Sequence, residues 1–393
     1  MDILFLSQWL PYPTNNGSKL RIYNLLCGLA HRHRVTLLSF ADECELNSVP
    51  AELSAICREV QILPRQKFDP HSSRSRLGFF SQTPRSLYAT YSQEMERRIK
   101  QSMSSTSYDL VIASQLAMAS YMPFLPKLPA LFEEAELGLY YDQFMNASSS
   151  RARLRYALTW AKQSHYLNFL LRHFSACTVV SERERALLLS CVSEKHMVEV
   201  VPNFVNLCAY KRVQPSPEPN TLIFTGSLGY FANHDAMVWF LQEIFPRIRA
   251  SVPESQLIIT GDHGDLPLPP AENVIRKGLV GDVASLIASA GVSLVPIRQG
   301  GGTRLKILEA MALRTPVVAT TKGVEGLEVQ HGKHLLIADT PEDFARQTIR
   351  LLNEPELRRC LKEHAYRLVA ERYDSSIVMP RLMNLLTQIV PSV

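Results

Sequence analysis

The stretch Gly300-Gly301-Gly302-Thr303-Arg304-Leu305-Lys306-Ile307-Leu308-Glu309 lies between an apolar run that ends at Pro296 and a segment of helical periodicity. Leu305, Leu308 and Ala312 recur at helical spacing. A helix is therefore expected to begin near Thr303, a residue type that suits the N-cap position. A buried strand, a glycine-rich turn and a helix in this order are typical of nucleotide-binding Rossmann-like units. The stretch predicts an α/β fold with a phosphate site at the turn.

The turn also carries the charges expected of an anion site. Consecutive glycines let an anion approach the backbone, and the N–H groups of a helix start point toward it. Arg304 and Lys306 fall in the expected first turn, where the helix dipole disfavours cations unless an anion neutralises them. We interpret the pair as a diphosphate cradle; the alternative is a flexible loop with solvated basic residues. Glu309, further along the helix, suits two vicinal ribose hydroxyls or a structural salt bridge.

The same alternation of apolar runs and helical stretches extends over the 393 residues, and it predicts two doubly wound parallel sheets with crossover helices. A proline-rich break supplies the boundary. We predict a first, acceptor-binding Rossmann-like domain over 1–203, a linker over 204–220, a donor-binding domain over 221–375, and a C-terminal helix at about 376–393 that packs back on the first domain. Expected strands are 3–7, 34–40, 60–63, 110–114, 130–133, 176–180, 198–201, 222–225, 256–260, 273–275, 292–296, 316–319 and 334–337. The polar segment 65–85 is expected to be a mobile loop.

Composition and charge exclude several classes of protein. A net charge of +5 without an aromatic-interleaved basic stripe argues against nucleic-acid binding. The seven scattered cysteines form no Cys-x-x-Cys pair, so neither a disulfide framework nor a zinc site is indicated, and a reducing, cytoplasmic compartment fits best. We expect no catalytic metal, because no Asp-x-Asp motif is present, and no cofactor. Neither a signal peptide nor a transmembrane helix is expected.

The region from Gly300 to Ala319, continued by Gly323-Val324-Glu325-Gly326-Leu327, resembles the donor-site signature of the family 4 retaining glycosyltransferases of the GT-B fold, the group 1 glycosyl transferases. That family carries two glutamates separated by seven residues. Glu309 matches the second, and Gly301 stands at the first, as in a sub-branch with glycine there. The resemblance implies two Rossmann-like domains facing across a cleft. It also implies transfer of a sugar, with retention, from a nucleoside-diphosphate sugar to a hydroxyl acceptor such as a polysaccharide, a lipid-linked glycan or a small molecule.

The resemblance also assigns donor-site residues. The loop Phe224-Thr225-Gly226-Ser227-Leu228, with Asn233 and Ala236, resembles the loop that opens the family's donor domain, and Lys277-Gly278-Leu279-Val280 resembles the loop that reads the nucleobase. Family members often hold the diphosphate with an Arg and a Lys after the first loop; here Arg304 and Lys306 are expected to replace them, with Glu309 on the ribose. The expected donor-binding set is Asn16, Gly17, Gly226, Ser227, Lys277, Gly278, Val280, Gly300, Gly301, Gly302, Thr303 and Leu305.

The sequence gives few clear signals of functional residues in the first domain. Family members often carry a histidine after the strand that corresponds to 110–114, but Ser114-Gln115 stands here, so that role does not transfer. Glu133, Glu134 and Glu136 form an acidic cluster at an expected strand end, where parallel sheets carry functional groups. We interpret this cluster as a solvated acidic turn.

Other functions remain open at this point. A GT-B nucleotide-sugar 2-epimerase would need acid and base residues that the sequence does not mark, and an NAD-dependent oxidoreductase is disfavoured because no Gly-x-Gly-x-x-Gly follows strands 3–7 or 222–225. A non-catalytic nucleotide-sugar binding protein is the third alternative. The basic segment 65–85 and the helix start Arg151-Ala152-Arg153-Leu154-Arg155, with Trp160, Tyr166, Phe169 and Phe174 beyond it, predict peripheral contact with an anionic membrane. Alternatively, that helix packs its aromatic residues into the core.

Overall fold

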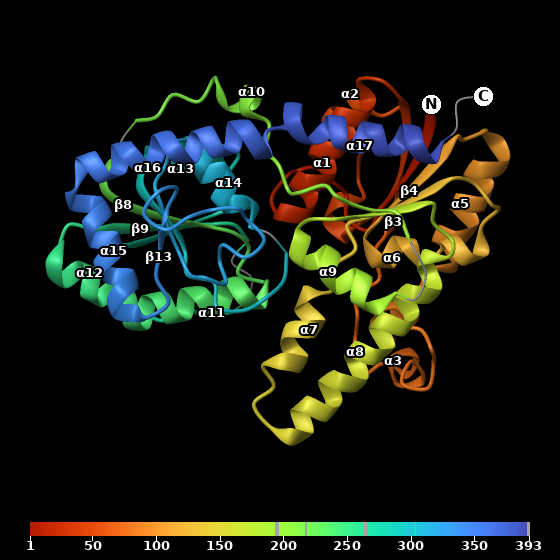
Figure 1. The fold of residues 1–393 in the computed structure, drawn as a ribbon, viewed down its shortest axis with the longest axis horizontal. Helices are drawn as coiled ribbons and strands as arrows, with labels where there is room; N and C mark the ends of the chain where they lie inside the picture. Colours follow the sequence, from red (N-terminus) through yellow and green to blue (C-terminus); the bar gives the residue numbers. More distant parts are fainter. Residues whose placement is uncertain (193–195, 217, 263–265, 303, 391–393) are drawn as a thin grey trace. The chain divides into compact units, whose positions relative to one another are not determined.

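The computed structural model describes residues 1–192, 196–216, 218–262, 266–302 and 304–390, and it contains two compact α/β units (Figure 1). The first unit comprises Met1–Pro13, Ser18–Val201 and the chain from Met379 on. The second unit comprises Thr14–Gly17 and Pro202–Val378. The predicted fold class, two parallel-sheet α/β domains, is confirmed.

The first unit is built on a seven-stranded parallel sheet of order β3-β2-β1-β4-β5-β6-β7 within the described residues. The side chains from Ile3 to Leu6 in β1 are fully buried, as expected for a strand that is covered on both faces. The chain runs outward to β2 and β3 on one side of β1 and to β4 on the other, so the sheet has its topological switch point between β1 and β4. The strands are β1 (Asp2–Ser7), β2 (Arg34–Ala41), β3 (Glu59–Pro64), β4 (Leu110–Ser114), β5 (Ala130–Glu133), β6 (Ala176–Val179) and β7 (Val198–Val200).

The longer helices of the first unit pack one face against the sheet or a neighbouring element. In α5, Met95, Ile99 and Ser102 are buried at helical spacing, and the Ser92 hydroxyl accepts a hydrogen bond from the Met95 amide at 3.2 Å as the N-cap. Gly28 of α1 lets α17 come close, because a Cβ there would lie 2.4 Å from the Met379 methyl carbon. The helices are α1 (Gly17–Ala30), η1 (Glu43–Glu45), α2 (Ala51–Ile56), α3 (Ser73–Leu77), α4 (Arg85–Thr90), α5 (Gln93–Ser105), α6 (Gln115–Ala119), η2 (Met122–Phe124), α7 (Gly138–Met145), α8 (Ser150–Leu171), α9 (Glu182–Cys191) and α17 (Ser375–Ile389).

The second unit contains a six-stranded parallel sheet of order β10-β9-β8-β11-β12-β13 in the part of the chain that the structure describes. Its switch point lies between β8 and β11. The strands are β8 (Glu218–Thr225), β9 (Gln256–Thr260), β10 (Val274–Gly278), β11 (Ala290–Val295), β12 (Val317–Ala319) and β13 (Leu336–Ile337). The helices are α10 (Leu207–Tyr210), α11 (Phe231–Trp239), the π-helical η3 (Phe240–Ile244), α12 (Phe245–Ser251), α13 (Val283–Ser289), α14 (Leu305–Ala312), α15 (Pro341–Asn353), α16 (Pro355–Leu368) and the π-helical η4 (Val369–Tyr373).

Several strands differ from the prediction by a few residues at their ends, and four other local predictions also differ from the structure. The expected loop 65–85 contains α3, because the Ser72 hydroxyl caps it by accepting a hydrogen bond from the Ser75 amide at 3.2 Å. The expected linker 204–220 holds α10 and the first residues of β8. The helix expected to begin near Thr303 begins at Leu305, since Arg304 has extended backbone angles and is the N-cap; Thr303 itself lies outside the described residues. Lys277 and Gly278, expected in a strand-end loop, belong to β10.

None of the helices in the described ranges combines the length and the apolar character needed to span a bilayer.

Candidate functional site

Two glycine-rich loops lie at the switch point of the second sheet. One begins at Gly226, directly after β8, and the other contains Gly300–Gly302, between β11 and α14. Since β8 and β11 are neighbouring parallel strands, both loops leave the carboxyl edge of the sheet side by side, where open α/β sheets bind their ligands. The predicted phosphate turn therefore lies where the topology favours a ligand.

Gly226 brings its backbone against the side chain of Lys306. Its φ of 138° lies in the region that side-chain-bearing residues rarely adopt. A Cβ at this position would lie 2.8 Å from Asn233 Nδ2 and 2.9 Å from Lys306 Nζ. Only glycine fits there, and the sequence-predicted Gly226 and Lys306 are thus brought together.

The start of α14 has no side-chain cap. Gly300 and Gly302 both have positive φ, at 98° and 74°, and Arg304 occupies the N-cap position without a capping hydrogen bond. The Arg304 guanidinium turns back toward the loop: Nη1 donates to the Gly301 carbonyl, and Nη2 donates to the Gln299 carbonyl at 3.5 Å. Its Nε is buried and has no hydrogen-bond partner among the described residues. Buried donors in proteins are normally paired. The unpaired Nε and the uncapped helix start therefore indicate a binding site for a ligand that carries hydrogen-bond acceptors.

Lys306 is a partly buried cation without a carboxylate partner. Its Nζ donates to Asn233 Oδ1 at 3.1 Å and lies 4.1 Å from the centre of the Phe224 ring. In the described part of the chain no carboxylate lies within ion-pair distance of it. Burial, and then the Arg304 charge, lower the pKa of Lys306 to about 7. A cation held in this environment favours the binding of an anion, which would replace its lost hydration.

Glu309 lies one turn further along α14. The Tyr210 hydroxyl donates to Glu309 Oε1 at 3.3 Å. Burial raises the pKa of Glu309 to about 7, while the Tyr210 hydrogen bond and the Lys306 charge oppose that rise. The carboxyl lies in the same helix as Lys306 and makes no salt bridge with the described residues, so it can accept hydrogen bonds from hydroxyl groups.

The other expected donor-site residues fall into two groups. The Ser227 carbonyl accepts a hydrogen bond from Asn233 Nδ2 at 2.8 Å, and the Gly278 carbonyl accepts one from the Gly261 amide at 2.8 Å, next to the Gly226 loop. These two residues therefore lie near the loop that contacts Lys306. Lys277 is exposed on β10, and Val280 is partly buried beyond it.

Residues 14–17, which include the expected donor-site residues Asn16 and Gly17, group with the second unit. A Cβ at Gly17 would lie 3.6 Å from Leu305 Cδ1. Gly17 and Leu305 are thus neighbours at the start of α14.

Three residues of the site were not in the predicted set. Asn233 binds both Lys306 and the Ser227 carbonyl. In the sequence, only the resemblance of the 224–236 region to the family's first donor loop pointed to this residue. Phe224, a fully buried core residue, presents its ring to Lys306. Tyr210 lies in the expected linker, where nothing in the sequence links it to Glu309.

The acidic cluster of the first unit is not the solvated turn that was expected. Glu133 is buried, with an ion pair of 2.7 Å to the buried Arg21 and a hydrogen bond of 2.7 Å from the Ser114 hydroxyl. Glu134 is partly buried, and only Glu136 is exposed. The prediction was wrong because Arg21 of α1, far away in the sequence, provides the counter-charge.

Residues 219–354, which include Gly226, Lys306 and Glu309, match the family model described as glycosyl transferases group 1. Because the matched domain is a glycosyltransferase domain, the chain is an enzyme of the transferase class. A relative in Klebsiella pneumoniae, described as an uncharacterized 44.6 kDa protein in cps region, is 22% identical and covers 96% of this chain and 97% of its own length.

Solved structures share the fold over the whole chain. Sucrose-phosphate synthase (tll1590) from Thermosynechococcus elongatus is 18% identical with a TM-score of 0.71, and each chain is covered to 99%. Anabaena Alr3699/HepE, solved in complex with UDP and glucose, is 15% identical with a TM-score of 0.66 over 99% of this chain and 100% of that one. The two parallel-sheet α/β domains are thus those of GT-B glycosyltransferase structures.

Proposed function

We propose that this enzyme transfers a sugar from a nucleoside-diphosphate sugar to a hydroxyl acceptor, and that α14 binds the diphosphate. The observation that carries this proposal is Lys306, a partly buried cation with a lowered pKa and, among the described residues, no carboxylate within ion-pair distance, at the uncapped start of a helix. A diphosphate would supply the missing charge, accept hydrogen bonds from the helix-start N–H groups, and pair the Nε of Arg304.

The same groups would stabilise the transition state. As the bond between the sugar C1 and the diphosphate oxygen breaks, its electron pair moves to the diphosphate. The positive charges of Lys306 and Arg304 stabilise the negative charge that develops there. The acceptor oxygen bonds to C1, and its proton passes to the leaving phosphate oxygen. This route leads to retention when attack and departure share one face of the sugar.

We propose that the reaction needs no metal ion. Lys306, Arg304 and the start of α14 supply the positive charge at the diphosphate. In the described ranges no three His, Cys, Asp or Glu side chains are grouped as a metal site. The positive charge of Lys306, Arg304 and the helix start is the reason for this proposal.

Glu309 is proposed to hold the ribose. An ionised carboxylate can accept hydrogen bonds from two vicinal hydroxyls, and Tyr210 favours the ionised form because its hydrogen bond lowers the pKa of Glu309. We propose a UDP-sugar as the donor, on the ground that Anabaena HepE, which shares the fold, is solved with UDP and glucose. For the acceptor we propose a polysaccharide or a lipid-linked glycan, since the Klebsiella relative is described as a protein in the cps region.

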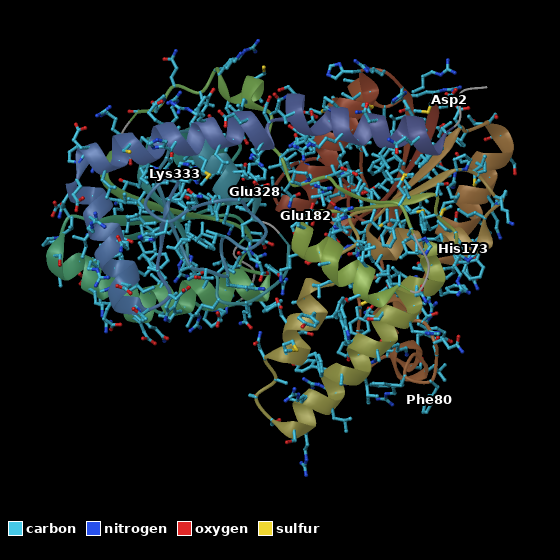
Figure 2. All side chains as sticks on the ribbon, in the orientation of Figure 1. Asp2, Phe80, His173, Glu182, Glu328 and Lys333 are labelled. Carbon is cyan, nitrogen blue, oxygen red and sulfur yellow. The ribbon has the colours of Figure 1, made fainter. Side chains whose placement is uncertain are left out.

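We also propose a cytoplasmic enzyme that contacts the inner face of the cell membrane. The aromatic residues first considered for this role mostly pack inward: Tyr166 and Phe174 are buried, and Trp160 packs against Tyr141. Instead, the region after α3 is apolar and exposed, with Phe79 65% and Phe80 92% exposed (Figure 2).

Basic side chains surround this apolar region. Arg74 and Arg76 lie in α3, and the Lys162 ammonium of α8 donates to the Gly78 carbonyl at 2.8 Å, which holds the two helices together. Apolar side chains at the tip and cations around it match the interface of an anionic bilayer.

A donor panel with product detection tests the proposed transfer. UDP-, GDP-, ADP- and TDP-sugars would be incubated with a glycan acceptor, and both nucleoside diphosphate and glycosylated acceptor would be measured by mass spectrometry. Transfer predicts equal amounts of the two products. Conversion of the donor into an epimer would instead indicate a 2-epimerase, and binding without any product would indicate a non-catalytic nucleotide-sugar protein.

A further inference from the structure

The carboxyl edge of the first sheet carries three hydrogen-bonded side chains on neighbouring strands. Trp9 follows β1, Gln115 follows β4 and Glu134 follows β5. Trp9 Nε1 donates to Gln115 Oε1 at 3.0 Å, and Gln115 Nε2 donates to Glu134 Oε2 at 3.0 Å. The β1–β4 pair is the switch point of this sheet, so the chain of side chains lies where a ligand crevice is expected.

The backbone at two of these positions is strained. Gln115 has a φ of 68° and Glu134 a φ of 60°, although both carry a Cβ. Left-handed conformations are unfavourable for such residues, and they concentrate at ligand-binding positions. Here they turn the side chains of Gln115 and Glu134 toward each other at adjacent strand ends.

Glu134 differs from its neighbour Glu133 in having no strong partner. Arg21 pairs closely with Glu133, at 2.7 Å, and its Nε lies 3.8 Å from Glu134 Oε1. The Glu134 side chain is 13% exposed, and in the described chain its only side-chain hydrogen bond comes from Gln115. Burial raises the pKa of Glu134 to about 8; the charge of Arg21 opposes this rise, and those of Glu133 and the exposed Glu136 add to it.

A cavity lined mainly by polar residues lies beyond Trp9, at the end of this row of side chains that is farther from Glu134. It has a volume of about 450 Å³, and its lining includes Asp42, Arg65, Lys67 and Asp69. The Arg65 guanidinium lies 4.2 Å from the centre of the Trp9 ring and pairs with Asp42 at 2.7 Å. Arg65 therefore joins the cavity to the three side chains. Charged side chains of both signs line this cavity and suit a ligand with many hydroxyls rather than an acyl chain.

We propose that Glu134, held in place by Gln115 and Trp9, binds a hydroxyl of a carbohydrate acceptor, and that further sugar units of a longer acceptor extend past Trp9 toward the cavity beside Arg65. The proposal rests on the proposed glycosyltransferase function for the role of this ligand as the acceptor. A carboxyl group, a primary amide and an indole at one sheet edge are the groups that bind sugar hydroxyls and ring faces. Glu134 is then an acceptor-binding residue, and Gln115 is a positioning residue.

Glycoside binding to the full chain tests this proposal. The probes are the p-nitrophenyl glycosides of glucose, galactose, mannose and N-acetylglucosamine, titrated by saturation-transfer NMR in the presence of UDP. At least one should bind the wild type, and Glu134→Ala should weaken it at least about tenfold, as expected for the loss of a hydrogen bond to a buried carboxyl. Glu199→Gln is the matched control, because it neutralises an exposed carboxylate on β7 of the same sheet, away from Glu134.

The pH dependence separates ligand contact from a structural role. Binding to the wild type should tighten from pH 7 to pH 9, because the ionised Glu134 carboxylate accepts stronger hydrogen bonds than the neutral acid. Glu134→Gln, which keeps the shape of the side chain, should bind with no such pH dependence. This readout remains decisive if Glu134→Ala does not fold.

Three results would overturn the proposal: no glycoside of the panel binds the wild type, Glu134→Ala binds as the wild type does, or Glu134→Gln keeps the pH dependence. UDP affinity should stay unchanged in the Glu134 variants and fall in Lys306→Met, which should still bind the glycoside. Failure of the acceptor site is thus distinguished from failure of the donor site.

Discussion

Replacing Lys306 by methionine removes the charge at the start of α14 and keeps an unbranched side chain of similar length. In the free enzyme, burial lowers the pKa of this lysine from 10.5 to about 7. The unfolded chain therefore binds more protons than the folded chain between these values, and the charged lysine destabilises the fold most at and below pH 7. After allowance for partial exposure, the cost is about 2–4 kcal/mol.

Lys306→Met should consequently be more stable than the wild type and unable to bind its donor. At pH 6.5 its melting temperature should rise by about 5–10 °C, a gain that shrinks as the pH approaches 10. Millimolar UDP should raise the melting temperature of the wild type and leave that of the variant unchanged. Differential scanning fluorimetry between pH 6 and pH 10, with and without UDP, measures both effects.

Lys333→Met is the matched control. Lys333 is an exposed lysine of the second unit (Figure 2), so its removal should change neither the stability nor the UDP response. A Lys306→Met variant that is no more stable than the wild type and still responds to UDP would refute the reasoning. The buried Lys306 charge would then neither destabilise the fold nor contribute to the anion site.

Four further outcomes are expected. Arg304→Ala should lower turnover by about 10²–10³-fold in a donor-hydrolysis or transfer assay, because its guanidinium opposes charge on the leaving diphosphate; equal rates would remove that role. Glu309→Gln should weaken UDP binding about tenfold or more in calorimetry while the melting temperature is maintained, whereas an unfolded variant would favour a structural role. Tyr210→Phe should raise the pKa of Glu309 further, so UDP binding at pH 7 should weaken and recover toward pH 9, and a flat pH profile would contradict the Tyr210–Glu309 coupling. Replacing both Phe79 and Phe80 by serine should reduce flotation with anionic liposomes about tenfold or more, and high salt should release the wild type; recovery in the soluble fraction under every condition would exclude the membrane contact.

Periodicity and turn residues in the sequence were sufficient to predict the fold class and most strands. The bounds of β4, β5 and β9 were predicted to the residue, because each is an apolar run between polar or turn residues. Helix α3 was missed because its five residues show no periodicity, and its serine cap is a local hydrogen bond that the surrounding polar residues obscure. The start of α14 was misplaced by two residues because three glycines and a threonine suit a cap equally well.

The candidate donor site was predictable where its residues lie in one motif. Lys306 and Glu309 were identified from the glycine-rich helix start, Gly226 came from the family resemblance of its loop, and the structure places Gly226 against Lys306. The hydrogen bond from Tyr210 to Glu309 joins residues 99 positions apart, so no local pattern could indicate it.

The carboxyl edge of the first sheet was interpreted wrongly for a similar reason. A run of acidic residues is expected to be solvated when the sequence does not show which buried arginine neutralises it. Arg21 lies 112 positions before Glu133, and only the fold brings them together. The left-handed backbone of Gln115 and Glu134 is likewise set by tertiary structure, not by the residue types.

Proton uptake on UDP binding tests the central claim most directly. At pH 8 the free enzyme should hold Lys306 mostly neutral, and a bound diphosphate should restore its proton, because a nearby anion raises the pKa of a lysine. Calorimetric titrations of UDP in two buffers of different ionisation enthalpy should therefore show uptake of close to one proton by the wild type. Lys306→Met should show neither the uptake nor tight binding. Binding without proton uptake, or equal affinity in the variant, would contradict the assignment of α14 as the diphosphate site.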